Sequence, residues 1–332
     1  MRILFVGGTR FVGRAMVESA VARGHEVTLL HRGQTNDPGL DRVEHLLADR
    51  NESLSVLAGR EFDATVDVCA YVPRHVRTLA AALDGRGGHH VLVSSVSAYA
   101  EPEGPGYDED SPLARLDDPT VEEVTGETYG GLKVLCEEAA AEAHGAARLA
   151  VLRPTYVVGP HDYTGRFTWW VRRIAAGGEV LVPGPYDAPM QVIDARDQGD
   201  LAIQVCEDAT AGAFTVASPA PPYGFGDLLD ATVAAVGPAG TRLTWVDPTW
   251  YAEQGGTYQT APLWTEGAAE NVMAADPARA VAAGLRTRPV EQTIVDTWTW
   301  LQQAEPEPTP GWGSSPEDEA RLLGAWQAAA RA

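Results

Sequence analysis

The sequence predicts an α/β fold in which a doubly wound parallel sheet of Rossmann type is followed by a smaller C-terminal α/β lobe. Three observations lead to this prediction. Apolar strands alternate with amphipathic helices over the first 160 residues, a glycine-rich turn joins the first strand to the first helix, and the alternation breaks down after Pro160. Such alternation favours parallel strands with right-handed crossovers and helices on both faces. We therefore expect one domain over residues 1–160 and a second, which includes the last helices, over residues 161–332.

The turn after the first strand is rich in glycine, and each glycine has its own geometric role. Gly7 permits a sharp change of direction, Gly8 lets a pyrophosphate approach the backbone, and Gly13 lets the first helix pack closely on the strand. The N–H groups at the helix start then face an anion. Ordinary strand-to-helix turns can look similar, but the position before a second strand at residues 26–30 favours a dinucleotide site. The predicted cofactor-binding residues here are Gly7, Gly8, Thr9, Arg10, Phe11, Val12 and Gly13.

The end of the second strand bears on the choice of cofactor. NAD sites of this kind carry an acidic side chain there, which binds the ribose hydroxyls, whereas this chain has His31 and Arg32. Arg32 could pair with the 2′-phosphate of NADP, and Arg10 could approach the same group. Each arginine could equally be a solvated surface residue. We therefore expect NADP as the cofactor, with NAD as the alternative, and include His31 and Arg32 among the cofactor-binding residues.

The remaining part of the first domain continues the alternation of strands and helices. Two adjacent histidines, His89 and His90, point to opposite faces of their strand and therefore do not chelate a metal together. The expected elements are strands at residues 43–48, 62–70 and 89–95, a helix at 73–83, a long acidic loop at 100–127, and a helix from Tyr129 to near Gly145.

Three side chains have the pattern of a catalytic group. Tyr129 and Lys133 are four residues apart and share one helical face, so the ammonium is close enough to lower the phenol pKa and to hold the nicotinamide ribose. Ser95, at the end of a strand, supplies a further hydroxyl. A Tyr-x-x-x-Lys pair alone occurs often by chance and can be a simple surface pair. Together with the glycine turn and the Ser-Ser strand end, in this order, it predicts Ser95, Tyr129 and Lys133 as catalytic residues.

With these motifs the chain resembles the extended short-chain dehydrogenase/reductases, the NAD-dependent epimerase/dehydratase family, over nearly its whole length. The resemblance implies that Tyr129 is the acid/base, that Lys133 is its electrostatic partner and a ribose ligand, and that Ser95 contacts the substrate hydroxyl or carbonyl. The sequence segments that carry it are residues 7–13, Asp49, residues 94–99, residues 129–133 and residues 152–160.

The resemblance also implies contacts with the cofactor and the assembly of the protein. Asp49 is expected near the adenine, and Ala70 and Tyr71 are expected along the cofactor. A homodimer, paired through the helix that bears Lys133, is a further expectation from the family. Arg10 replaces the middle glycine of the usual loop, which looks like the atypical branch that includes chloroplast RNA-binding relatives.

Several positions depart from the sugar-nucleotide enzymes of the family. Their asparagine after the arginine of the sixth strand falls at Tyr156, and their diphosphate-binding arginine falls near Met190. The Asp-Glu pair of the sugar dehydratases would fall at Val96 and Ser97, and neither carboxylate is present. These differences put a nucleotide sugar in doubt, although Arg166, Arg172, Arg173 or Arg196 could replace the missing arginine. The expected substrate-binding residues are Ser97, Tyr156, Arg166 and Gln191.

Composition excludes some classes of partner and leaves one question open. The net charge of −21 argues against a nucleic-acid partner, because no basic excess exists to release counterions. We expect a cytoplasmic protein without a membrane segment, with three buried thiols and without a metal site. An aromatic-rich stretch at residues 245–264 either covers the substrate or forms the core of the second lobe.

These observations predict an NAD(P)-dependent reductase or dehydrogenase. We expect residues 1–160 to bind the dinucleotide and residues 161–332 to bind a small-molecule substrate, at a carbonyl or hydroxyl group. One alternative is a nucleotide-sugar epimerase with bound NAD. A second is a non-catalytic, nucleotide-binding relative, which the complete Ser95, Tyr129 and Lys133 set argues against.

Overall fold

The fold was analysed in a computed structural model, which describes residues 1–35, 39–218, 223–265 and 271–329. The chain forms two compact units. The first contains Met1–Val157, Val192–Ala220 and Ala275–Thr287, and the second contains Val158–Gln191, Pro221–Ala274 and Arg288–Ala332. Two segments of the range expected for the second domain thus belong to the first unit, because one of them supplies the last strand of its sheet.

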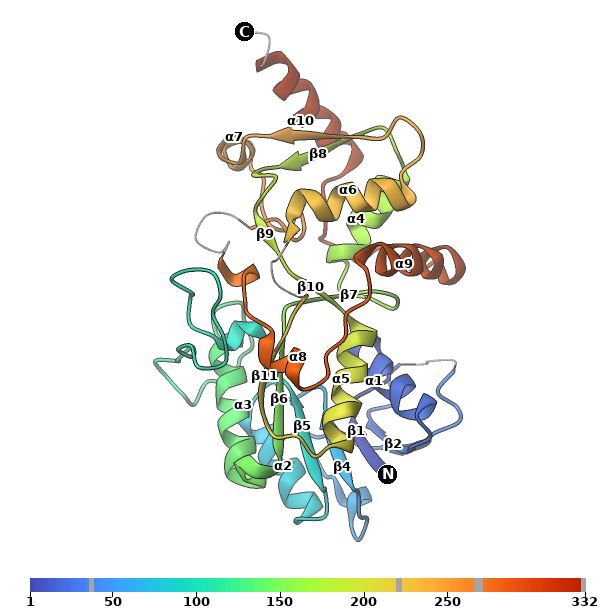
Figure 1. Ribbon diagram of the computed structural model, residues 1–332, viewed down its shortest axis with the longest axis vertical. Helices are drawn as coiled ribbons and strands as arrows, with labels where there is room; N and C mark the ends of the chain where they lie inside the picture. Colours follow the sequence, from blue (N-terminus) through green and yellow to red (C-terminus); the bar gives the residue numbers. More distant parts are fainter. Residues whose placement is uncertain (36–38, 219–222, 266–270, 330–332) are drawn as a thin grey trace. The chain divides into compact units, whose positions relative to one another are not determined.

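The first unit is built on a seven-stranded parallel sheet in the order β11-β6-β5-β4-β1-β2-β3. The predicted doubly wound parallel sheet is therefore confirmed (Figure 1). The strand order changes direction between β1 and β4, and open sheets of this type bind ligands beyond the carboxyl ends of the strands at that point. The strands are β1 (Arg2–Val6), β2 (Glu26–His31), β3 (Glu44–Leu47), β4 (Ala64–Asp67), β5 (His89–Val93), β6 (Leu149–Pro154) and β11 (Gly212–Val216).

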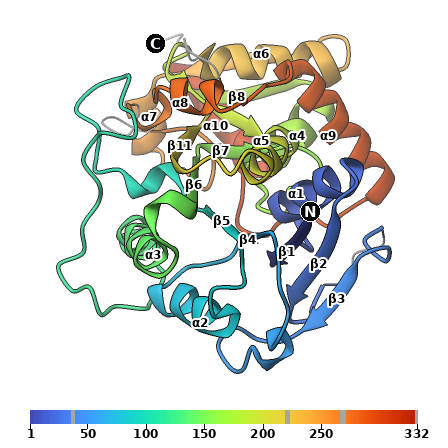
Figure 2. The same cartoon turned by 60° about the horizontal axis from the view of Figure 1, so that its bottom comes forward.

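Helices cover both faces of this sheet (Figure 2). Helices α1 (Phe11–Ala22) and α5 (Ala195–Glu207) pack together on one face, and α2 (Pro73–Leu83) and α3 (Tyr129–His144) pack together on the other. Alternate side chains of β1 enter the two cores, which is why its sequence is apolar throughout. The unit also contains the 3-10 turns η1 (Ser55–Leu57), η2 (Val96–Ala98) and η3 (Ala146–Arg148), the short strand β10 (Val192–Asp194) and helix α8 (Ala278–Ala282).

Most expected elements are present, with differences at their ends. β3 and β4 are shorter than the strands expected at 43–48 and 62–70, and the chain leaves the sheet after Asp67 at the end of β4. Helix α5 begins at Ala195, because the Asp194 side chain accepts the N–H of Arg196 and caps the helix.

The second unit is a small α/β assembly with two pairs of short strands. β8 pairs with β13 in parallel, and β9 pairs with β12 antiparallel. In the aromatic-rich stretch, Tyr251 and Trp264 are buried with their rings 5.4 Å apart, so these two side chains form core. Strand β7 (Tyr156–Val158) leads from the first unit to the second, whose elements are α4 (Arg166–Ala175), β8 (Glu179–Pro183), β9 (Pro189–Met190), β12 (Tyr223–Gly224), α6 (Phe225–Val236), β13 (Arg242–Val246), α7 (Pro248–Glu253), α9 (Val290–Ala304) and α10 (Pro316–Ala329).

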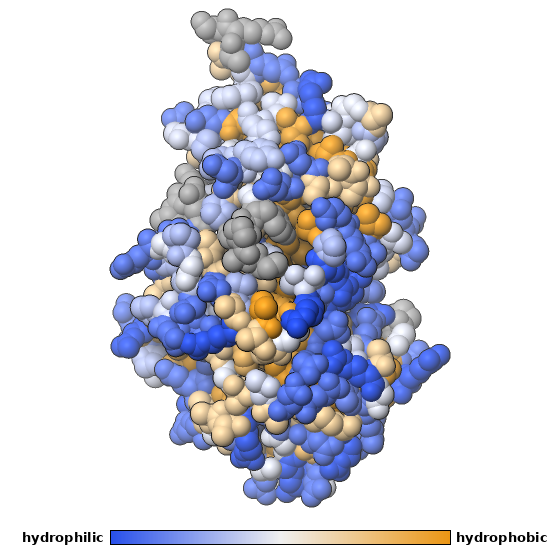
Figure 3. Space-filling model, viewed as in Figure 1, coloured by the Kyte–Doolittle hydropathy of each residue, from blue (hydrophilic) through white to orange (hydrophobic). Residues whose placement is uncertain are grey.

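Figure 3 shows one face of the molecule coloured by hydropathy. Hydrophilic residues cover most of this face, and hydrophobic areas lie between them along its middle. Within the described residues, no helix has the length and apolar character that a membrane span requires.

Candidate active site

The glycine turn after β1 has the backbone geometry that an anion site needs. Gly7 and Gly8 have φ angles of +92° and +99°, which side chains rarely permit. A Cβ atom on Gly13 would lie 2.6 Å from the Cα atom of Gly8, so helix α1 approaches the turn too closely for any other residue. The N-cap residue of α1, Arg10, is extended and exposed and makes no side-chain capping bond. This cradle, which added Cβ atoms would fill, fits the phosphates of a dinucleotide.

His31 at the end of β2 and His45 in the neighbouring β3 form a chain of hydrogen bonds. The N–H of Gly33 donates to Nδ1 of His31 at 3.1 Å, so that nitrogen carries no proton. Nε2 of His31 therefore donates to Nδ1 of His45 at 2.8 Å, and Nε2 of His45 donates to the carbonyl of Leu40 at 2.9 Å. Burial and the neighbouring His45 lower the pKa of His31. His31 is neutral in this arrangement, and the exposed Arg32 carries a positive charge at this strand end.

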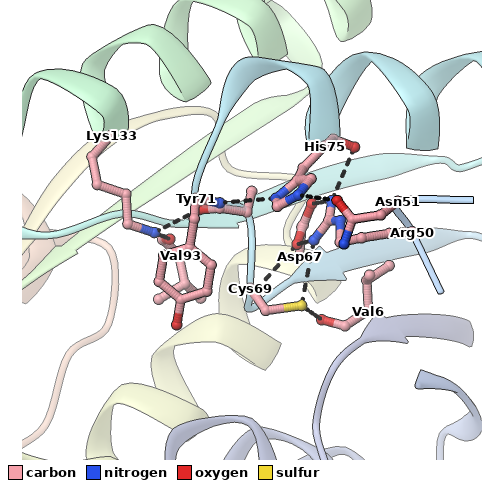
Figure 4. Close-up of polar contacts among 10 residues, drawn as sticks. Val6, Arg50, Asn51, Asp67, Cys69, Tyr71, His75, Val93 and Lys133 are labelled. Atoms are coloured by element: carbon pink, nitrogen blue, oxygen red, sulfur yellow. Dashed lines mark hydrogen bonds and ion pairs between the residues drawn. The ribbon is translucent and has the colours of Figure 1, made fainter. Parts of the chain in front are cut away.

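A buried ion pair lies where β4 ends, beside the glycine turn (Figure 4). The Arg50 guanidinium donates to both carboxylate oxygens of Asp67, at 2.8 and 2.7 Å, and also to the carbonyl of His75. Burial opposes ionisation of Asp67, but the Arg50 charge outweighs it and lowers the pKa of Asp67. The pair joins the segment after β3 to the end of β4, and the Arg50 bond to the His75 carbonyl adds α2. Sequence reasoning missed it, although a carboxylate inside an apolar strand is itself a signal of a buried, paired charge.

Asp49 and Tyr71, both expected near the cofactor, belong to one chain of contacts. The Asp49 carboxylate accepts the backbone and side-chain N–H groups of Asn51, at 2.8 and 3.0 Å. These bonds lower the pKa of Asp49, and the nearby Arg32 lowers it further. Nε2 of His75 donates to the Asn51 side chain at 3.0 Å, and Nδ1 accepts the backbone N–H of Tyr71 at 3.3 Å. Burial and the Arg50 charge lower the pKa of His75 to about 4, so it is neutral at physiological pH.

Lys133 is the most constrained of the predicted catalytic residues. Its side chain is on α3 and is only 3% exposed. Nζ donates to the carbonyl oxygens of Ala70 and Val93, each at 2.9 Å, which lie just beyond β4 and at the end of β5 (Figure 4). Nζ is 5.1 Å from the ring centre of Tyr71 and 5.8 Å from that of Tyr129. An ammonium has three N–H groups, so these two carbonyls leave one donor for a ligand.

Ser95 and Tyr129 come from two different elements, the turn after β5 and the start of α3. The Ser95 oxygen accepts the N–H of Ser97 at 3.1 Å and caps the turn η2. Tyr129 is the first residue of α3 and is half-buried. A Cβ atom on Gly130 would lie 2.1 Å from the Ser97 carbonyl oxygen, so the residue after Tyr129 packs directly on this turn. The structure thus brings the serine turn, the start of α3 and the Lys133 ammonium to one end of the sheet.

The four expected substrate contacts are divided between the units. Ser97 is exposed and Tyr156 is half-buried, both in the first unit. Arg166 is half-buried and Gln191 is fully buried, both in the second unit. Their contacts with a substrate stay predictions.

Comparison with known proteins identifies the family. The model of the NAD dependent epimerase/dehydratase family matches residues 3–217, which is well over half of the chain. The chain therefore belongs to this family, as the resemblance predicted. A nicotinamide dinucleotide is the typical cofactor of the family, and the glycine cradle fits it.

Two curated relatives match only part of this chain. The chain is 27% identical over 201 residues to the chloroplast stem-loop binding protein of 41 kDa b of Arabidopsis thaliana, covering 55% of this chain and 49% of the relative. It is 30% identical over 73 residues to the bifunctional pinoresinol-lariciresinol reductase of Forsythia intermedia, covering 21% and 23%. The chain thus spans half or less of the length of these relatives.

Solved structures with the same fold match nearly the whole chain. A UDP-glucose 4-epimerase has a TM-score of 0.71 at 15% identity, covering 95% of this chain and 100% of the epimerase. The Bordetella bronchiseptica enzyme WbmH, in complex with NAD+, has a TM-score of 0.68 at 15% identity, covering 91% and 98%. Likeness at this level of identity establishes the fold alone.

Proposed function

We propose that this protein is an NADP-dependent reductase or dehydrogenase that acts on a carbonyl or hydroxyl group of a small metabolite. The observation that carries the proposal is the Lys133 ammonium, which two backbone carbonyls hold at 5.1 Å from the ring centre of Tyr71 and 5.8 Å from that of Tyr129. A buried ammonium with one remaining donor is suited to binding a ribose hydroxyl and to stabilising a phenolate beside it.

The proposed chemistry divides the work among three side chains. The bound nicotinamide supplies a hydride in reduction and accepts one in oxidation. In reduction, Ser95 donates a hydrogen bond to the carbonyl oxygen, and the Tyr129 hydroxyl transfers its proton to that oxygen. The resulting phenolate is stabilised by Lys133 and regains a proton from solvent. The reverse reaction uses Tyr129 as the base.

The preference for NADP rests on charge at the end of β2. Arg32 and Arg10 are exposed, and either guanidinium can pair with a 2′-phosphate. The neutral His31 adds no charge, because both of its ring nitrogens are used within the protein. Asp49 partly offsets Arg32, so we expect a moderate preference for NADP over NAD.

The alternative of a nucleotide-sugar epimerase needs a cation for the substrate diphosphate. Of the four candidate arginines, Arg173 and Arg196 make ion pairs with carboxylates. Arg173 binds Glu319 at 2.6 Å and two backbone carbonyls, and Arg196 binds Asp194 at 2.7 Å. These contacts favour a substrate without a diphosphate.

The name of the Arabidopsis relative raises a third candidate, binding of a nucleic-acid stem-loop. The net charge of −21 opposes such a partner, because binding to a polyanion draws its free energy from released counterions. We therefore propose a small-molecule substrate and no nucleic acid.

One experiment separates these candidates. Nucleotide released from the denatured protein is identified by mass spectrometry, and NADPH oxidation is followed with a panel of small ketones. We expect little retained NAD+ and NADPH oxidation only when a suitable ketone is added. Tightly retained NAD+ together with interconversion of a UDP- or dTDP-hexose would establish the epimerase. NADPH binding without any turnover would favour the non-catalytic relative.

A further inference from the structure

A buried carboxylate lies one helical turn beyond Lys133. Glu137 is on α3, four residues after Lys133, and is 7% exposed. Its Oε1 accepts the hydroxyl of Ser94 at 2.5 Å and the Nε–H of Arg153 at 3.1 Å, and its Oε2 accepts Nη2 of Arg153 at 2.6 Å. Neither the glycine turn nor the Tyr129, Lys133 and Ser95 set accounts for this cluster.

Burial of this carboxylate is possible because it is fully paired. An ionised carboxylate in a protein interior is costly unless opposite charge and hydrogen bonds surround it. Arg153, on β6, supplies two of the three donors, and its guanidinium also lies 4.7 Å from the centre of the Tyr99 ring. The third donor, Ser94, is a neutral hydroxyl, so the ion pair does not need it for charge balance.

Ser94 connects the cluster to the candidate active site. It is 3% exposed, follows β5 directly and precedes Ser95. Successive turns of α3 therefore hold successive residues of one strand end, since Lys133 binds the Val93 carbonyl and Glu137 binds the Ser94 side chain. The backbone at Ser94 is fixed as well, because its N–H donates to the Leu152 carbonyl of β6 at 2.7 Å.

We propose that Glu137 is a positioning residue, which sets Ser95 relative to Tyr129 and Lys133 through the Ser94 hydroxyl. The inference rests on the proposed function, because it assigns Glu137 to the same hydride-transfer site. Glu137 acts on the strand end and does not touch the substrate. Loss of the hydrogen bond between Ser94 and Glu137 lets the turn at residues 95–98 shift, while the glycine cradle is unchanged. Displacements of about 1 Å at a reacting group can reduce rates by about a hundredfold.

The test uses two variants and a matched control. Ser94→Ala removes the hydroxyl and leaves the ion pair, and Glu137→Gln keeps the shape of the side chain but not its charge. The control is Ser19→Ala, because Ser19 on α1 also donates a hydroxyl to a carboxylate, Asp200, at 2.6 Å and is 8% exposed. Ser19→Ala also removes a hydrogen bond from a serine hydroxyl to a carboxylate, but at a place away from the strand end that carries Ser95.

Two readouts are measured on the full chain. The first is kcat and the NADPH Kd, with 9,10-phenanthrenequinone as the carbonyl probe. The second is amide hydrogen exchange of peptides that cover residues 93–99, which needs no substrate. For Ser94→Ala and Glu137→Gln we expect kcat to fall by about ten- to a hundredfold, with the NADPH Kd within about twofold of wild type and faster exchange at residues 93–99. Ser19→Ala is expected to leave both readouts unchanged.

The outcomes separate this inference from the proposed function. Unchanged exchange at residues 93–99 in folded Ser94→Ala protein would overturn the positioning role, and so would wild-type kcat in both variants. If Glu137→Gln does not fold, Ser94→Ala still decides. In a further outcome, the wild-type protein reduces neither the quinone nor any ketone while Ser94→Ala still exchanges faster at residues 93–99. That result would support the role of the Ser94–Glu137 hydrogen bond and overturn the proposed reductase function.

Discussion

The two ends of the candidate site lie at the same edge of one sheet but are built in different ways. The turn between β1 and α1 is shaped by its main chain, with glycines at φ angles of +92° and +99° and an approach that excludes a Cβ atom. The end formed by β5, β6 and α3 is shaped by buried side chains, namely Lys133, Glu137 and Arg153. The first end is therefore sensitive to added atoms, and the second to lost hydrogen bonds and charges.

The largest effect is expected at the side-chain end. Tyr129→Phe removes only the phenolic oxygen and its proton, so kcat should fall by roughly the 100- to 10,000-fold that general acid–base catalysis contributes. The NADPH Kd should change little, because the glycine cradle is intact. Steady-state kinetics and a fluorescence titration measure the two quantities. Equal turnover by the variant and wild type would mean that Tyr129 is not the acid/base.

A single methyl group should disrupt the main-chain end. The Cβ atom of Gly13→Ala would lie 2.6 Å from Gly8, and overpacking of this kind costs about 1–3 kcal/mol of stability. We expect about a tenfold or greater loss of NADPH affinity, measured by the same titration. The control is Gly104→Ala, whose added Cβ meets nothing within 4 Å. Wild-type affinity in Gly13→Ala would show that the turn does not hold the nucleotide.

A smaller effect should distinguish the two nucleotides at the end of β2. Arg32→Ala should lower the affinity for NADPH by about tenfold and leave that for NADH unchanged, because one charge-assisted contact with the 2′-phosphate is worth on the order of 1.5–3 kcal/mol. Isothermal titration with both nucleotides checks this. Tighter binding of NADH than NADPH by wild type would contradict the expected cofactor.

The smallest effect concerns acid sensitivity, which a buried histidine near the start of β5, away from the candidate site, should confer. His90 on β5 is buried and stacks on His144 at 4.0 Å, and burial lowers its pKa to about 3. In the unfolded chain the His90 imidazole binds a proton near pH 6.5, whereas in the folded chain it stays neutral to a much lower pH. The free energy of unfolding therefore falls as the pH decreases from about 6.5 towards 3.

His90→Phe keeps a ring at this position and removes the titration. Between pH 6 and 5 it should reduce the pH dependence of the unfolding free energy by up to about 1.4 kcal/mol per pH unit. Urea unfolding of both proteins at several pH values measures it. Identical slopes would contradict a neutral, buried His90.

What the sequence revealed depended on how far apart the interacting residues are. The glycine turn and the Tyr129–Lys133 pair are local, so their spacing, together with their order along the chain, predicted the sheet edge and the helix face. Arg50 with Asp67, and Glu137 with Arg153, are 17 and 16 residues apart on different elements, and only the folded sheet brings each pair together. An ionisable residue inside an apolar strand, as at Asp67 and Arg153, was the available signal.

The prediction of the domain boundaries was limited in the same way, because it depended on residues far apart in the sequence. Strand β11 follows the break in the alternation and pairs with β6 after a long excursion of the chain through the second unit. No local pattern at residues 192–220 indicates that return. The role of His31 likewise depended on His45 in β3, which no spacing rule connects to the end of β2.

The most direct test of the account is the fate of a deuterium label. NADPH carrying deuterium on either face of its C4 atom is incubated with wild-type protein and a ketone that the panel identifies, and the alcohol product is analysed by mass spectrometry. We expect the deuterium of one face to appear on the carbinol carbon, and Tyr129→Phe to form this product at least about a hundredfold more slowly. Deuterium that stays in the cofactor while the product is formed, or product formed equally fast by Tyr129→Phe, would contradict it.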